Sequence, residues 1–130
     1  MLPGGAELLR GLKKAGIKAA IVSTKRGDTI EIILERLGLA DTVELVIGSA
    51  DVKRHKPDPE GVFAALDRLG VQPEDALFCG DTVLDAGAAK NAGTHFAAVL
   101  NGTTPAEDFA QFPADHISPD LWDLAQWLGV

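Results

Sequence analysis

Short apolar runs rich in Val, Ile and Ala alternate along this chain with longer stretches in which apolar residues recur every three or four positions. The short runs fit buried parallel strands, and the longer stretches fit helices with one apolar face. Strands that alternate with helices in this way favour a mostly parallel sheet with right-handed crossovers. The pattern therefore predicts an α/β protein in which ligands bind outside the carboxyl ends of the strands.

The individual elements follow from this alternation. Strands are expected at residues 19–22, 44–47, 76–79 and 96–100. Helices are expected around residues 8–12, 30–37, 62–69, 86–91 and 121–128, and Trp122 and Trp127 are expected to pack the last one. A glycine suits the end of each of the first four helices, at Gly16, Gly38, Gly70 and Gly93. Because no internal repeat or low-complexity segment interrupts the pattern, residues 1–130 are predicted to form a single domain.

Composition limits the class of partner. The chain has 130 residues, 46% of them hydrophobic, which is enough for one domain that buries roughly two-thirds of its unfolded surface. Its formal net charge of −7 gives no broad positive field for a nucleic-acid backbone or an anionic lipid surface. We therefore expect neither nucleic acid nor membrane as a partner.

The single cysteine, Cys79, excludes an intrachain disulfide and offers no zinc site. It lies in an apolar run, so we expect a small core residue rather than a reactive thiol. The N-terminus has no basic segment followed by an apolar core, and no apolar run approaches the ~18 residues of a membrane-spanning helix. These features predict a cytoplasmic protein.

Two carboxylates stand close together after the third predicted strand, in Gly80-Asp81-Thr82-Val83-Leu84-Asp85. Neighbouring carboxylates repel each other, and a cation such as Mg²⁺, which prefers oxygen ligands, relieves that repulsion. Asp81 and Asp85 are therefore candidate metal ligands. The simpler interpretation is that Asp81 caps the following helix and Asp85 is a solvated acid in its first turn.

Two further polar groups are placed to meet an anion. Ser23-Thr24 follows a buried strand, where a hydroxyl and nearby backbone N–H groups could hold phosphate oxygens, although such residues are also common helix caps. Lys56 lies in His55-Lys56-Pro57-Asp58-Pro59, a loop stiffened by two prolines that would hold an ammonium in a fixed place. His55 itself is interpreted as a loop residue.

The order of these groups resembles haloacid-dehalogenase-like phosphatases, in particular their phosphoglycolate-phosphatase-like branch. The resemblance rests on Ile21-Val22-Ser23-Thr24-Lys25, on His55 to Pro59, and on Gly80 to Asp85 with Ala88-Ala89-Lys90-Asn91-Ala92-Gly93. Leu2-Pro3-Gly4 also resembles the return to the core after that family's cap domain. Together these motifs extend from about residue 2 to about residue 101.

The resemblance implies a three-layer, Rossmann-like core and an Mg²⁺-dependent phosphatase acting on a small phosphorylated metabolite. By the same resemblance, Ser23 and Thr24 would bind the phosphoryl group and Lys56 would orient it and neutralise its charge as the catalytic lysine. Asp81 and Asp85 would hold part of the Mg²⁺ shell. The family's nucleophile comes from an Asp-x-Asp motif, which this sequence does not contain, so activity is expected to be absent or very weak.

The resemblance also implies that the first strand of the family's sheet and its cap domain are missing. That strand would lie between the strands that end at Ser23 and at Gly80. Its absence leaves two unpaired central edges, and such edges attract other strands. We expect the two strands either to close onto each other or to take a strand from a second copy or a complementing chain.

Other functions remain as alternatives. The first is a non-catalytic half-domain that acts by binding phosphate, Mg²⁺ or another protein. A receiver-like signalling domain also combines aspartate, hydroxyl and lysine on a parallel sheet, but the order of acidic residues fits it poorly. A dinucleotide-binding domain and a nucleoside triphosphate loop are disfavoured, because neither G-x-G-x-x-G nor G-x-x-x-x-G-K-[ST] is present.

Overall fold

A computed structural model of the chain describes residues 4–100 and 104–130. In this part of the chain the strands are β1 (Ala20–Val22), β2 (Leu45–Ile47), β3 (Leu77–Gly80), β4 (His95–Val99) and β5 (His116–Ser118). The α-helices are α1 (Gly5–Lys14), α2 (Gly27–Arg36), α3 (Glu60–Leu69), α4 (Val83–Ala92) and α5 (Leu121–Leu128). Leu2 and Pro3, which carry part of the resemblance, lie outside the described residues.

The predicted α/β order is confirmed, with every expected helix and strand found within a few residues of its expected bounds. Strand β5 was not expected. It comprises His116, Ile117 and Ser118, of which only Ile117 is apolar, so it carries no apolar run of its own. Within residues 4–100 and 104–130, no helix is long and apolar enough to cross a membrane.

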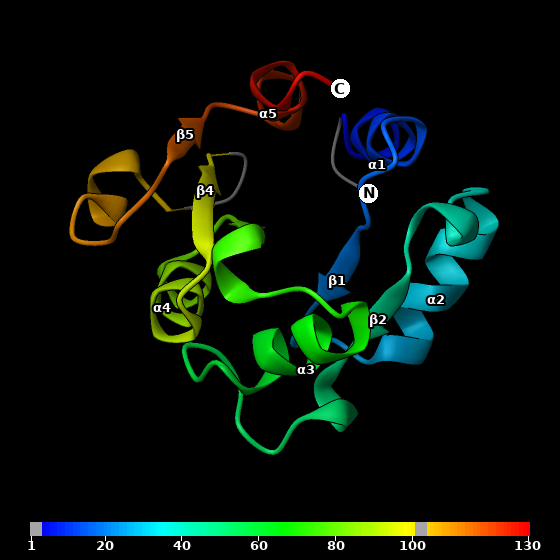
Figure 1. Ribbon diagram of the computed structural model, residues 1–130, viewed down its shortest axis with the longest axis horizontal. Helices are drawn as coiled ribbons and strands as arrows, with labels where there is room; N and C mark the ends of the chain where they lie inside the picture. Colours follow the sequence, from blue (N-terminus) through cyan, green and yellow to red (C-terminus); the bar gives the residue numbers. More distant parts are fainter. Residues whose placement is uncertain (1–3, 101–103) are drawn as a thin grey trace.

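The strands form two separate parallel groups in the described part of the chain. β1 pairs with β2, with Ile21 opposite Val46, while β4 lies between β3 and β5. No pairing joins β1 to β3 in the described residues, and Figure 1 shows the two groups on different sides of the molecule. The expectation of direct closure is therefore wrong. Helices hold the two groups apart.

One face of the three-stranded sheet is covered by α1 and α5. Leu124 of α5 is fully buried against Ala97 and Val99 of β4, and Leu8 of α1 packs against the same cluster. The two helices also pack against each other (Figure 1). Helix α1 precedes β1 in the chain, yet it packs against this cluster and α5, and it also contacts the 3-10 turn Ala40–Thr42 that precedes β2.

The opposite face is covered by α3 and α4. Phe96 of β4 is buried against Ala86 and Ala89 of α4, and Val62 of α3 packs against α4. Helix α3 also contacts β1 and β2, where a side chain at Gly61 would lie 3.0 Å from a methyl of Val22. Helix α3 therefore connects the two strand groups, and helices cover both faces of the three-stranded sheet in a three-layer arrangement.

Cys79 differs from its sequence-based prediction. It lies in β3 as expected, but it is exposed rather than part of the core. Its strand has no hydrogen-bonded neighbour on the side away from β4 in the described residues. Desolvation of the sulfur by the protein around it raises the pKa of the Cys79 thiol to about 12, so the thiol is a slow nucleophile at neutral pH.

The two tryptophans of α5 also lie less deeply than expected. Trp122 is 52% exposed and Trp127 is 43% exposed. The Trp127 ring stacks on the His116 ring with centroids 4.6 Å apart, and His116 Nε2 lies 2.8 Å from Asp123 Oδ2. This hydrogen bond lowers the pKa of the Asp123 carboxyl below its ordinary 3.8. The cluster attaches α5 to β5.

Acid is expected to loosen this attachment. Because its folded pKa is lowered, the Asp123 carboxylate contributes stability above pH 3.8 and loses it as the pH falls through the lower folded value. A tryptophan-fluorescence titration from about pH 5 downward should show this change. The Asp123→Asn variant should lack this component. Identical curves for the two proteins would contradict the assignment.

Candidate functional site

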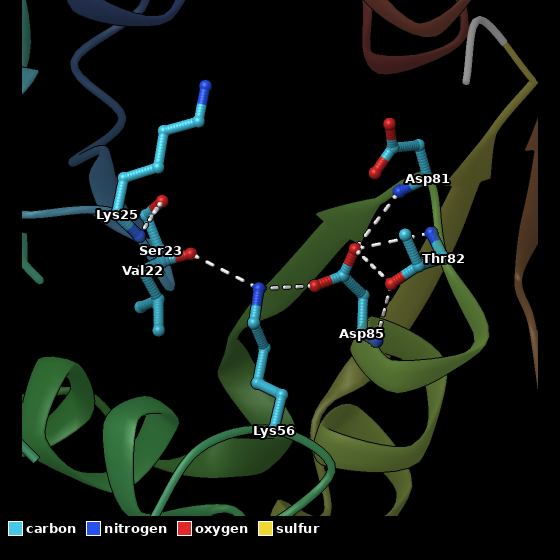
Figure 2. A network of polar contacts seen from close by, with 7 residues as sticks. All are labelled: Val22, Ser23, Lys25, Lys56, Asp81, Thr82 and Asp85. Atoms are coloured by element: carbon cyan, nitrogen blue, oxygen red, sulfur yellow. Dashed lines mark hydrogen bonds and ion pairs between the residues drawn. The ribbon is translucent and has the colours of Figure 1, made fainter. Parts of the chain in front are cut away.

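The polar residues singled out in the sequence lie at the carboxyl ends of β1 and β3, as predicted. Ser23 directly follows β1, Asp81 directly follows β3, and Lys56 extends from the loop before α3 (Figure 2). Parallel strands place their carboxyl ends at one edge of the fold, which is where α/β proteins bind ligands. The site therefore lies between the two strand groups.

Lys56 links the two strand groups. Its ammonium donates to Asp85 Oδ1 at 2.5 Å and to the carbonyl oxygen of Val22, the last residue of β1, at 3.4 Å (Figure 2). The side chain of Lys56 is only 14% exposed and that of Asp85 only 8%. A buried pair of opposite charges is costly to break, so the ammonium is held at one position.

Asp85 is fixed by the start of α4 as well as by Lys56. Its Oδ2 accepts from the backbone N–H groups of Asp81 and Thr82 and from the Thr82 hydroxyl, at 3.0 to 3.2 Å. The Thr82 hydroxyl in turn accepts from the Asp85 N–H, which completes a capping box. Gly80 makes this approach possible, because a Cβ there would lie 2.4 Å from the Asp85 carboxylate.

The simpler interpretation of the two aspartates is wrong in detail. The helix cap is Thr82 rather than Asp81, and Asp85 is buried rather than solvated. The spacing Thr82-x-x-Asp85 in the sequence is a capping-box pattern, and it could have predicted both the Thr82 cap and its bond with Asp85. In Figure 2 the Asp81 carboxylate points away from that of Asp85, and it has no hydrogen-bond partner among the described residues. Of the two carboxylates, that of Asp81 is therefore the one available to bind a ligand.

Ser23 and Thr24 meet Lys56 at a small pocket. The pocket is also lined by Arg54 and His55 and by the apolar side chains of Val22, Ile47 and Val52, so cationic and hydroxyl groups share it with an apolar wall. The Ser23 hydroxyl accepts from the Lys25 N–H at 3.1 Å, which orients it within the turn after β1. Three of the predicted site residues thus come together here. Asp85 joins them through Lys56, and Asp81 lies apart.

The loop that carries Lys56 has anchors that sequence reasoning missed. The Glu60 carboxylate accepts from the N–H groups of Lys53 and Arg54, at 2.8 and 3.2 Å. The Asn91 side chain, from α4, donates to the Pro57 carbonyl at 2.9 Å. Asn91 is part of the quoted 88–93 segment, but nothing in its spacing indicated a contact with residue 57.

The donor set fits Mg²⁺ in part. Among residues 4–100 and 104–130 there is no group of three acidic, histidine or cysteine side chains placed to hold a metal. Asp81 supplies one free carboxylate, whereas both oxygens of Asp85 already accept hydrogen bonds. Mg²⁺ often keeps several waters and takes one or two carboxylates plus phosphate oxygens, so a partial shell of this kind suits it.

The sequence matches a known family over most of its length. Residues 1–99 match the family described as haloacid dehalogenase-like hydrolase. A pyrophosphatase PpaX from Bacillus velezensis is 40% identical over 95% of this chain, which covers 57% of that protein. A phosphoglycolate phosphatase from Rhodospirillum rubrum is 35% identical over 98% of this chain, which covers 52% of that protein.

Solved structures of haloacid dehalogenase-like proteins are also similar to this chain. A Bacteroides fragilis protein described as haloacid dehalogenase-like aligns with a TM-score of 0.92 and 41% identity, over 95% of this chain and 59% of that one. CbbY from Rhodobacter sphaeroides, solved with phosphate, aligns with a TM-score of 0.84 and 28% identity over 95% of this chain and 55% of that one. The chain thus spans between half and three-fifths of these relatives.

Proposed function

Because the chain belongs to the haloacid dehalogenase-like hydrolase family, we propose that it carries the phosphate-binding half of an Mg²⁺-dependent phosphatase site for a small phosphorylated metabolite. One observation carries the proposal. The buried ammonium of Lys56 is held between β1 and α4, and Lys56 lines the same small pocket as Ser23. A fixed cation that shares a pocket with an oriented hydroxyl is suited to bind a phosphoryl group. A cytoplasmic location is part of this proposal.

Each residue has a role in the proposal. Ser23 and Thr24 bind phosphoryl oxygens at the opening they share, and Lys56 neutralises and orients the phosphoryl group. Asp85 positions Lys56 and the start of α4, because both of its oxygens are engaged there. Asp81 is the metal ligand that this chain offers directly. Mg²⁺, when bound, would neutralise phosphate charge.

Turnover needs a group that these 130 residues do not contain. The sequence has no Asp-x-Asp, and none of the described residues places a free carboxylate beside Ser23 and Lys56. Covalent transfer of the phosphoryl group therefore has no nucleophile within this chain. The substrate class follows from relatives named for phosphoglycolate and pyrophosphate, which are both small anions.

A second candidate is a non-catalytic half-domain that binds phosphate or a partner. It is favoured by the same absence of an Asp-x-Asp motif within these 130 residues. The two candidates share the binding step and differ in turnover. Phosphate binding is therefore the property to test first.

Inorganic phosphate is expected to bind in the presence of Mg²⁺, and Ser23→Ala should weaken binding by about tenfold, through loss of one hydrogen bond to a charged group. Calorimetric titration of the purified chain with phosphate measures this. The matched control is Ser118→Ala, because Ser118 lies in β5 and outside the pocket. Equal binding by both variants, or no binding by the unmodified chain, would contradict the proposal.

A further inference from the structure

The loop that carries Lys56 is docked along the side of helix α4. In the first turn of α4, Asp85 accepts from the ammonium of Lys56 at 2.5 Å (Figure 2). Two further residues of the same helix, Gly87 and Asn91, meet Pro57, the residue that follows Lys56. One helix therefore contacts both ends of the lysine, its ammonium and the backbone from which its side chain extends.

Gly87 and Asn91 are four residues apart and so lie on one face of α4. The side-chain amide of Asn91 donates to the Pro57 carbonyl oxygen at 2.9 Å. A Cβ at Gly87 would lie 2.8 Å from the Cβ of Pro57, which is closer than such carbons approach, so the proline ring takes the space that a side chain there would need. Asn91 thus supplies a hydrogen bond to the loop, and Gly87 allows the close approach.

The ion pair with Asp85 does not by itself fix the position of Lys56. A lysine ammonium stands at the end of a long, flexible side chain, so it can keep one partner while its backbone moves. The second contact of the ammonium, with the Val22 carbonyl oxygen, is long at 3.4 Å. The place of residues 56 and 57 against α4 therefore determines how the ammonium is presented to the pocket that Lys56 shares with Ser23.

The other anchor of the loop acts at a different point. Glu60, in the first turn of α3, accepts from the N–H groups of Lys53 and Arg54, at the start of the loop. The Pro57 carbonyl, at its far end, is held by Asn91. Loss of the Asn91 amide should therefore release residues 56 and 57 while residues 53 and 54 stay in place.

Asn91 contributes little to the stability of α4 itself. It is exposed in the last turn of the helix, where asparagine is a weaker helix former than alanine. Alanine at this position should therefore remove the bond to Pro57 without weakening the helix. The effect of the amide on the loop can thus be separated from its effect on the fold.

We propose that Asn91 is a positioning residue for Lys56, acting through the Pro57 carbonyl, with Gly87 allowing the loop to approach α4 closely. Asn91 does not itself contact the phosphoryl group. The inference rests on the proposed function for what Lys56 binds. The placement of Lys56 is a property of the chain without ligand, so that it can be measured whether or not phosphate binds.

Lysine acetylation at constant pH, followed by mass spectrometry, measures this placement. In the unmodified chain Lys56 should react slowly, because its side chain is 14% exposed and its ammonium is paired. Asn91→Ala should raise the rate at Lys56 by about fivefold, the effect of losing one hydrogen bond. Lys53 is the internal reference, because Glu60 holds its backbone, and its rate should not change.

Three variants separate the amide donor from the fold. Asn91→Asp has the same shape without a donor and should behave as Asn91→Ala does, whereas Asn91→Gln keeps an amide and should return most of the protection of Lys56. The matched control is Gln126→Ala, which removes an exposed amide from the last turn of α5. The urea midpoint of Asn91→Ala should not fall below that of the unmodified chain.

Titration with inorganic phosphate in the presence of Mg²⁺ connects placement to binding. Asn91→Ala should bind phosphate about fivefold more weakly than the unmodified chain, and Gln126→Ala should bind it equally well. Faster labelling of Lys56 without phosphate binding by any of these proteins would overturn the proposed function and leave the positioning role standing. Unchanged labelling of Lys56 in Asn91→Ala and Asn91→Asp would overturn the inference. Equal acceleration at Lys53 would overturn it too, because Asn91 would then stabilise the whole loop.

Discussion

The Asp85→Ala variant is expected to lose about 3–5 kcal/mol of its free energy of unfolding, the usual cost of removing one partner of a buried ion pair. The change leaves the Lys56 ammonium, 14% exposed, without its carboxylate. It also removes the acceptor of two backbone N–H groups at the start of α4. Urea unfolding followed by circular dichroism measures the loss.

The matched control is Asp81→Ala. Asp81 is four residues away, but its carboxylate has no hydrogen-bond partner among the described residues, so the free energy of unfolding should change by less than about 0.5 kcal/mol. Asp85→Asn should lie between the two, because an amide oxygen can still accept from the Thr82 hydroxyl while the charge is lost. Equal losses for Asp81→Ala and Asp85→Ala would contradict the separate roles assigned to them.

The order of helices and strands could be predicted from the sequence, because apolar residues recur at different spacings in buried strands and in amphipathic helices. Residues 30–37 carry apolar side chains at helical spacing, and α2 spans Gly27–Arg36. Strand β5 could not be predicted in this way. It is held by its pairing with β4, with Ile117 opposite Ala98, and not by an apolar run.

The edges of the sheet were harder to predict than its strands. The resemblance indicated two unpaired central strands, and direct closure would have satisfied their backbone groups. The structure keeps them apart while α3 contacts β1 and β2 on one side and α4, which packs on β3 and β4, on the other. Such long-range packing leaves no local pattern in the sequence.

The site was predictable in its residue types but not in its contacts. Strand-end position placed Ser23, Lys56 and Asp81 on one edge, as the structure has them. Nothing in the spacing distinguished the free Asp81 from the fully engaged Asp85. That difference depends on a lysine 29 residues earlier, whose loop is held by Asn91 of α4.

The second large effect concerns turnover. The 130-residue chain is expected to hydrolyse p-nitrophenyl phosphate about 10⁴- to 10⁶-fold more slowly than a family member that has its nucleophile, since removing a catalytic nucleophile has effects of this size. The Bacillus velezensis relative, assayed in parallel, provides the reference. Lys56 and Asp81 would still hold phosphate and metal, so binding should persist where turnover does not.

Hydrolysis of p-nitrophenyl phosphate with and without Mg²⁺, by the rigorously purified chain and its Asp81→Ala variant, tests this account most directly. The account predicts no turnover above the background rate in any of these reactions, together with Mg²⁺-dependent phosphate binding by the unmodified chain. Mg²⁺-dependent turnover that disappears in Asp81→Ala would contradict it, because a nucleophile would then have to exist within these 130 residues.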